Sequence, residues 1–156
     1  MNKTPKLTRK FFASALAAAT TAVIVMAPVA HARDTLLNLP IEAALAKANA
    51  SGKLAPGIKL FFGDQKYPKP LAQIGNTRTN KKTNFFNKTD VEGCEWTFLS
   101  AMISLTQYAQ SVGGNALVNI RSNYKNQPFS SETEYKCGAG NVTGGVAFTA
   151  DVVKLP

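Results

Sequence analysis

The sequence predicts an α+β fold in which a small, mostly antiparallel sheet has one long and one short helix packed on one face. Two segments carry most of this prediction. A capped amphipathic helix is expected over residues 89–112, and after two glycines a half-buried strand is expected over residues 116–124. Another strand is expected over residues 146–153, where inward and outward side chains alternate. Together with the shorter elements described below, this order favours the α+β class.

The first part of the folded chain contains short elements separated by turn residues. Residues 34–39 are expected to form an edge strand, and Pro40 then favours the start of a helix over residues 41–50. Residues 58–62 read as a strand and residues 71–79 as a second, more polar strand, with prolines between them. This region is thus expected to supply three strands and the short helix.

The long helix is predicted from its capping residues and from apolar residues spaced alternately by four and three. Thr89 and Glu92 have the S/T-x-x-E form of a capping box, and Gly113-Gly114 stops the helix. The apolar stripe contains Phe98, Met102, Leu105, Ala109 and Val112. We expect this stripe to pack into the core rather than to line a ligand groove, because an amphipathic helix buries its apolar face on another element.

The strands that follow are predicted from side chains that alternate with a period of two. In the first, Ala116, Val118 and Ile120 are expected to face inward. Asn119, Arg121 and Asn123 are then expected to face outward. A shorter strand is expected over residues 133–137, and the glycine-rich residues 138–145 are expected to form a hairpin turn or bulge. The inward side of the last strand is expected to hold Val146, Phe148, Ala150 and Val152.

Residues 1–32 have the features of a signal peptide. Four basic residues precede an apolar run over residues 11–29, and Ala30-His31-Ala32 is a small-x-small cleavage site. We expect cleavage after Ala32, a periplasmic or secreted location, and a single domain over residues 33–156 with no membrane span. The alternative is an uncleaved anchor, because the apolar run approaches the length of a membrane span.

The charge of the expected mature chain is moderately positive. Four of the 18 Lys and Arg residues, and none of the nine Asp and Glu residues, lie before Arg33, so the net charge falls from +9 to +5. A basic surface favours anionic partners without identifying one. At 124 residues, the mature chain suits one domain with one hydrophobic core.

The chain contains two cysteines, Cys94 and Cys137, and both lie in the expected mature part. Two cysteines in an oxidising compartment usually pair, so we expect a disulfide that closes a separation of 43 residues. It would attach the start of the long helix to a later strand. The alternative is a catalytic or metal-binding pair of thiols, although no C-x-x-C spacing and no second ligand cluster is present.

The best candidate for a binding surface is the basic and aromatic stretch over residues 78–88. Its basic residues are Arg78, Lys81, Lys82 and Lys88. These side chains could bind phosphates or acidic sugars while Phe85 and Phe86 stack or insert. The alternative is a solvated loop whose two phenylalanines fold back into the core.

Several kinds of catalytic chemistry lack the residues that they need. The only histidine, His31, lies in the signal peptide, so a mature Ser-His-Asp or Cys-His arrangement is excluded. Neither a dinucleotide-binding fingerprint nor a phosphate-binding loop is present. Glu132 and Glu134 are expected on one strand face, which is a weak indication of acid–base or calcium chemistry. We expect no cofactor, no metal and no ATP.

From about Ile74 to the C-terminus, the sequence resembles two related bacterial families. The motif is a helix that ends in a small residue, then Gly114-Asn115-Ala116-Leu117-Val118, a polar loop and a final strand that contains glycine. It is similar to the YbjQ-like family of small α+β proteins, some described as heavy-metal binding, and to the RcsF family of envelope-stress sensor lipoproteins. The RcsF pattern implies that a cysteine opening the helix, here Cys94, pairs with one near the last strands, here Cys137.

The chain departs from the RcsF pattern in three ways. It has no lipid-bearing cysteine, two cysteines rather than four, and an additional segment over residues 33–70. Signalling is therefore not carried over from that family. The chain also resembles small exported bacterial proteins described as excinuclease ATPase subunits, but it lacks the nucleotide-binding motif that such an activity needs.

These observations favour a non-catalytic, envelope-associated or binding protein stabilised by one disulfide. Its expected partner is an envelope protein or an anionic polymer. The alternatives are an enzyme that uses carboxylates or a reactive thiol, and an anion- or nucleic-acid-binding protein that acts through the basic stretch.

Overall fold

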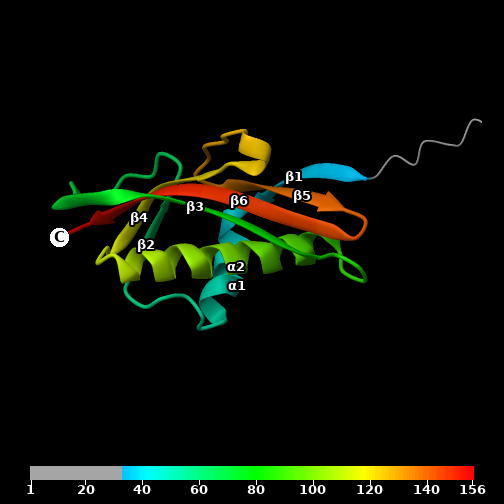
Figure 1. The fold of residues 1–156 in the computed structure, drawn as a ribbon, viewed down its shortest axis with the longest axis horizontal. Coiled ribbons are helices and arrows are strands. Elements are labelled where there is room, and N and C mark those ends of the chain that lie inside the picture. Colours follow the sequence, from blue (N-terminus) through cyan, green and yellow to red (C-terminus); the bar gives the residue numbers. More distant parts are fainter. Residues whose placement is uncertain (1–32) are drawn as a thin grey trace, which may run out of the picture. The chain divides into compact units, whose positions relative to one another are not determined.

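The computed structural model describes residues 33–156, so the predicted signal peptide and its cleavage site lie outside the described residues. The elements in chain order are β1 (Asp34–Pro40), α1 (Ile41–Ala50), β2 (Lys59–Phe62), β3 (Ala72–Asn84), α2 (Asp90–Ser111), β4 (Ala116–Ser122), the 3-10 turn η1 (Tyr124–Asn126), β5 (Glu134–Gly140) and β6 (Thr143–Lys154). The predicted α+β class is confirmed. Both helices lie on one side of the sheet (Figure 1).

Strand β6 is the centre of a six-stranded sheet. β3 pairs antiparallel with one edge of β6 along its whole length. The other edge is shared, because β5 pairs with its first residues and β4 with its last ones. β1 then pairs with β5, and β2 pairs with β4 in the one parallel pairing of the described chain. The sheet is therefore mostly antiparallel, as predicted, but it is open rather than small.

Helix α2 begins and ends where its sequence predicts. The backbone N–H of Glu92 donates to Thr89 Oγ1 at 3.2 Å, which caps the first turn, and Gly113 takes a positive φ of 81° after the last turn. The predicted stripe is buried as far as Ala109. Val112 is 38 % exposed, contrary to prediction, because it is the C-cap residue at which the chain leaves the helix.

The core between α2 and the sheet is centred on Phe98. Its ring centroid lies 4.7 Å from that of Tyr135 on β5 and 5.6 Å from that of Phe148 on β6. No helix within residues 33–156 is long and apolar enough to cross a membrane.

Strand β4 is buried on both faces, so the prediction of one dry and one wet face is wrong. Leu117 and Ile120 pack into the core under α2, whereas Ala116 and Val118 pack into a smaller cluster on the opposite face. The change occurs at Asn119, where β4 has one more residue than β6 and φ is 52°. Such a bulge shifts the alternation by one residue, and asparagine tolerates the left-handed backbone conformation better than most residues.

Strand β3 continues five residues beyond the predicted end at Thr79, through a segment predicted to be part of a binding loop. Asn80 to Asn84 pair in register with β6, from Asn80↔Ala147 to Asn84↔Thr143. The strand is polar on both faces, since it lies at the edge of the sheet. Backbone pairing rather than an apolar face therefore holds this segment.

Phe85 and Phe86, which follow β3, have opposite environments. Phe85 is 3 % exposed, and its ring lies between two glycines: a Cβ added to Gly93 would come within 2.6 Å of the ring, and one added to Gly144 within 2.4 Å. Phe86 is 63 % exposed. The alternative in which phenylalanines fold back into the core is thus confirmed for Phe85 alone.

The predicted glycine-rich hairpin is present, but most of its glycines lie in the strands. The loop itself consists of residues 141–142, between β5 and β6. A Cβ on Gly145 would come within 2.4 Å of the carbonyl oxygen of Lys81, so glycine at this position allows β3 to approach β6.

Candidate anion-binding site

One face of the sheet is covered by the helices, and the other carries polar side chains beside the smaller apolar cluster that contains Ala116 and Val118. On β6 the predicted inward residues Val146, Phe148, Ala150 and Val152 all belong to the core that packs against α2. The residues between them, from Gly145 to Asp151, therefore face the other way. Figure 1 shows η1 on this second side, away from α1 and α2. We call the second side the outer face.

The four basic residues predicted to bind anions do not form one patch. Arg78 and Lys82 pair with Thr149 and Gly145 of β6, so they lie on the outer face. Lys81 pairs with Val146 and lies on the helix-covered side.

Lys88 follows the end of β3, and its Nζ donates to the carbonyl oxygen of Asn84 at 3.0 Å. Two of the four basic residues therefore share a surface. The structure adds others to it from a different part of the chain.

The same sequence pattern, N-x-R-x-N-x-K, occurs on both sides of β6. On β3 it consists of Asn76, Arg78, Asn80 and Lys82. On β4 and η1 it consists of Asn119, Arg121, Asn123 and Lys125. The two copies belong to segments that flank β6 on opposite edges, so β6 lies between them.

The two copies are aligned row by row across β6. Arg78 and Arg121 both pair with Thr149 and form one row. Asn80 pairs with Ala147, and the backbone N–H of Asn123 donates to the carbonyl oxygen of the same residue at 2.8 Å.

Asp151 occupies the corresponding central position in the row of Asn76 and Asn119. Asn76 pairs with Asp151, and Asn119 Nδ2 donates to its Oδ2 at 2.7 Å. Because of the bulge at Asn119, Arg121 of the second copy lies in the same row as Arg78 of the first. We call the surface formed by these rows the outer-face groove.

The groove has long side chains along both sides and short ones along its floor. Two adjoining hollows occupy it, of about 760 and 350 Å³, and Arg78 lines both. Tyr108 of α2 also lines the larger hollow. Because side chains stand roughly perpendicular to a sheet, the small residues Gly145 and Ala147 leave a channel between the flanking rows.

The groove carries more positive than negative charge, since Asp151 is the one carboxylate among the described residues that line its two hollows. Arg78, Lys82 and Arg121 take part in none of the ion pairs or side-chain hydrogen bonds formed among residues 33–156. Lys125 differs, because the Asp34 carboxylate accepts a hydrogen bond from its Nζ and raises the pKa of the lysine. Arg78 and Arg121 are therefore two exposed guanidinium groups in one row without an internal partner.

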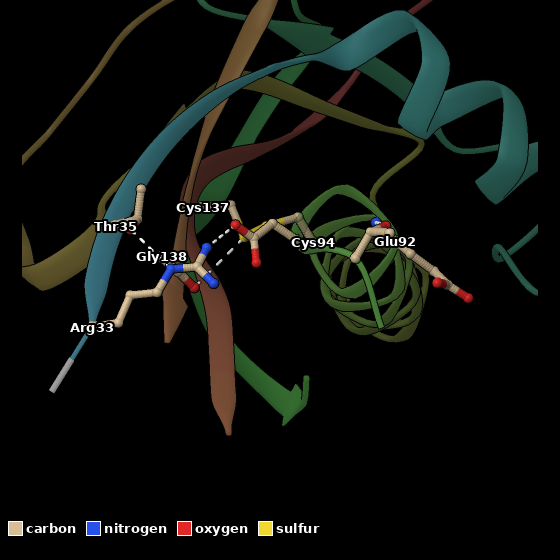
Figure 2. A network of polar contacts seen from close by, with 8 residues as sticks. Arg33, Thr35, Glu92, Cys94, Cys137 and Gly138 are labelled. Carbon is tan, nitrogen blue, oxygen red and sulfur yellow. Dashed lines mark hydrogen bonds and ion pairs between the residues drawn. A yellow bond between two sulfur atoms is a disulfide. The ribbon is translucent and has the colours of Figure 1, made fainter. Parts of the chain in front are cut away.

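The predicted disulfide between Cys94 and Cys137 is confirmed. It attaches the first turn of α2 to β5, with a Cα–Cα distance of 5.9 Å, and both residues are completely buried. Figure 2 shows the bridge beside Arg33, whose Nε donates to Thr35 Oγ1 and whose guanidinium pairs with the Asp90 carboxylate. No free cysteine is present among the described residues, which removes the thiol that a cysteine-based enzyme would use.

The carboxylates form no metal-binding cluster among residues 33–156. Glu132 and Glu134 are both exposed, and Glu95 pairs with Lys47 of α1. Within residues 33–156, no three His, Cys, Asp or Glu residues lie close enough to hold a metal ion.

The hydroxyl of Tyr135 is a buried side-chain oxygen without a hydrogen-bond partner in the described chain. Burial, and secondarily the Glu95 carboxylate, raise the pKa of this phenol far above its ordinary value. The phenol therefore stays protonated in the folded state after it has ionised in the unfolded state. The folded state then loses stability as the pH rises above about 10, by up to about 1.4 kcal/mol per pH unit.

We expect Tyr135→Phe to flatten this alkaline loss, because phenylalanine cannot ionise. At neutral pH the substitution should cost less than about 1 kcal/mol or stabilise the protein, since it removes an unsatisfied buried group. Urea unfolding followed at pH 7 and at several values above 10 measures both effects. Equal alkaline slopes for the two proteins would contradict this account of Tyr135.

Comparison with known proteins gives no relative for this chain: no protein-family model, no curated protein and no solved structure matches it. The resemblance to the YbjQ-like and RcsF families therefore stays a prediction. The candidate site depends on the geometry of this chain alone.

Sequence reasoning found half of the groove and missed the other half. The sequence predicts Asn119, Arg121 and Asn123 only on the wet face of a strand, and Asn76 lies outside the predicted binding stretch of residues 78–88. The repeated N-x-R-x-N-x-K pattern is visible in the sequence. Its significance depends on the pairing of both copies with β6, and a single sequence does not reveal that pairing.

Proposed function

We propose that this chain is an exported, non-catalytic protein that binds an anionic ligand in the outer-face groove. The main support is the row in which Arg78 and Arg121 face one another across Thr149. A guanidinium has five N–H donors in a planar fork that matches carboxylate, sulfate and phosphate groups. Two such groups without internal partners favour an anion that both of them contact.

Export is a separate part of the proposal. The signal-peptide features of residues 1–32 support it, and the buried disulfide is compatible with an oxidising compartment. In the periplasm or outside the cell, the groove would meet the anionic polymers of the envelope. A binding role needs neither a general base nor a cofactor.

We expect Arg78→Ala with Arg121→Ala to weaken binding of a heparin hexasaccharide about a hundredfold, because each lost charged hydrogen bond contributes about 1.5 kcal/mol. Isothermal titration calorimetry at fixed salt measures the change. The matched control is Lys81→Ala with Lys88→Ala, which removes the same charge from the same stretch but outside the groove.

The control pair should weaken binding no more than a few fold. Equal losses for the two pairs would show that only the overall charge matters, and the proposed site would then be wrong. Elution from a heparin column should follow the same order, with the arginine pair eluting at the lowest salt concentration.

A further inference from the structure

We propose that the ligand of the outer-face groove is a linear acidic polysaccharide that lies along β6. This inference deepens the proposed function and depends on it. It follows from two properties of the groove: its direction and the order of chemical groups along it.

The direction of the groove requires an elongated ligand. Successive rows lie two residues apart on antiparallel strands, so they are spaced by roughly 7 Å along β6. The floor at Gly145 and Ala147 carries at most a methyl group, which lets a chain lie close to the sheet. A small anion would contact one row, whereas a polymer contacts all of them.

The order of groups along the groove is amide, guanidinium, amide and ammonium. On β3 these are Asn76, Arg78, Asn80 and Lys82. The two cationic positions are therefore separated by roughly 14 Å, with an amide between them. A matching polymer has anionic groups separated by neutral groups that form hydrogen bonds.

The amides favour hydroxyl groups over further anions. An asparagine side chain has two N–H donors and a carbonyl acceptor, and a sugar hydroxyl can serve both because it donates and accepts. Neither Asn80 nor Asn123 forms a side-chain hydrogen bond within residues 33–156, so both amides are available. Polyphosphate oxygens only accept hydrogen bonds, so this ligand would offer no donor to the carbonyl oxygens of the two amides.

Single-stranded nucleic acid is the competing anionic polymer, and the probes below distinguish it from a glycan. Proteins that bind single strands combine basic grooves with aromatic side chains on which the bases stack. Aromatic side chains do adjoin the groove, because Tyr108 lines the larger hollow and a Cβ on Gly138 would come within 2.0 Å of the Tyr124 hydroxyl. An acidic glycan needs hydrogen bonds and charge, and the rows supply both.

The test compares four probes at equal salt: a galacturonic acid hexamer, a heparin hexasaccharide, linear polyphosphate and oligothymidylate of matched charge. We expect the two glycans to bind at least about tenfold more tightly than the other probes, a difference of about 1.4 kcal/mol. Calorimetry gives the affinities of the folded full-length mature protein, and circular dichroism verifies the fold of each variant.

The decisive variant is Asn80→Ala with Asn123→Ala. It should weaken glycan binding about tenfold through the loss of neutral hydrogen bonds, and it should weaken polyphosphate binding less, because phosphate uses only the N–H donors of each amide. If polyphosphate or oligothymidylate bound more tightly than the glycans, the glycan assignment would be wrong. The same holds if the asparagine variant lost equal affinity for all four probes. In both cases the proposed function would stand as long as binding depends on Arg78 and Arg121. Absence of any binding that depends on Arg78 and Arg121 would overturn the proposed function itself.

Discussion

Replacement of Cys94 and Cys137 together by alanine is expected to lower the free energy of unfolding by about 4 kcal/mol. The bridge closes a separation of 43 residues, and the chain-entropy model gives this value for a loop of that length. The melting temperature of a domain of this size should then fall by about 15 °C. Urea unfolding of the double variant, with reduced and oxidised wild-type protein beside it, measures the change.

The reduced wild-type protein is the control for the lost sulfur atoms. It keeps both side chains and loses only the bond, so it should unfold near the midpoint of the double variant. If both proteins kept the midpoint of the oxidised form, the disulfide would have no role in holding α2 against β5.

Replacement of Phe85 by alanine is expected to cost roughly 3–5 kcal/mol, the usual range for a buried phenylalanine. The ring fills the space between Gly93 of α2 and Gly144 of β6, and neither glycine has a side chain that could move into the resulting cavity. The loss should therefore lie near the upper end of the range. Chemical unfolding at neutral pH measures it.

The next residue is the matched control. Phe86→Ala removes the same atoms from a side chain that is 63 % exposed, and it should change stability by less than about 0.5 kcal/mol. Similar costs for the two substitutions would contradict the burial of Phe85. A large cost for Phe86 alone would indicate that the two rings exchange places.

The sequence predicts the elements whose signal is local. The capping box at Thr89, the apolar stripe of α2 and the alternation of β6 all appear in the structure, because each depends on neighbours within one or two turns or pleats. The sequence also predicts the disulfide, since two cysteines allow only one intramolecular pairing.

The features that the sequence did not reveal depend on long-range pairing. Residues 80–84 read as a loop because neither face is apolar, yet their backbone pairs with β6. The bulge at Asn119 places Ala116 and Val118 on the face opposite Ile120, and no local pattern marks a bulge of this kind. The same two features align the two copies of the N-x-R-x-N-x-K pattern. The candidate site therefore depends on strand pairing that the sequence alone does not reveal.

The position of β6 also affects how the chain assembles. Translation delivers residues 143–154 after every segment that pairs with them, so β3, β4 and β5 have no shared partner until β6 has been made. A nascent chain interrupted before Thr143 can form helical turns, but it cannot close the sheet. Closure of the sheet therefore follows the synthesis of β3, β4 and β5 rather than accompanying it.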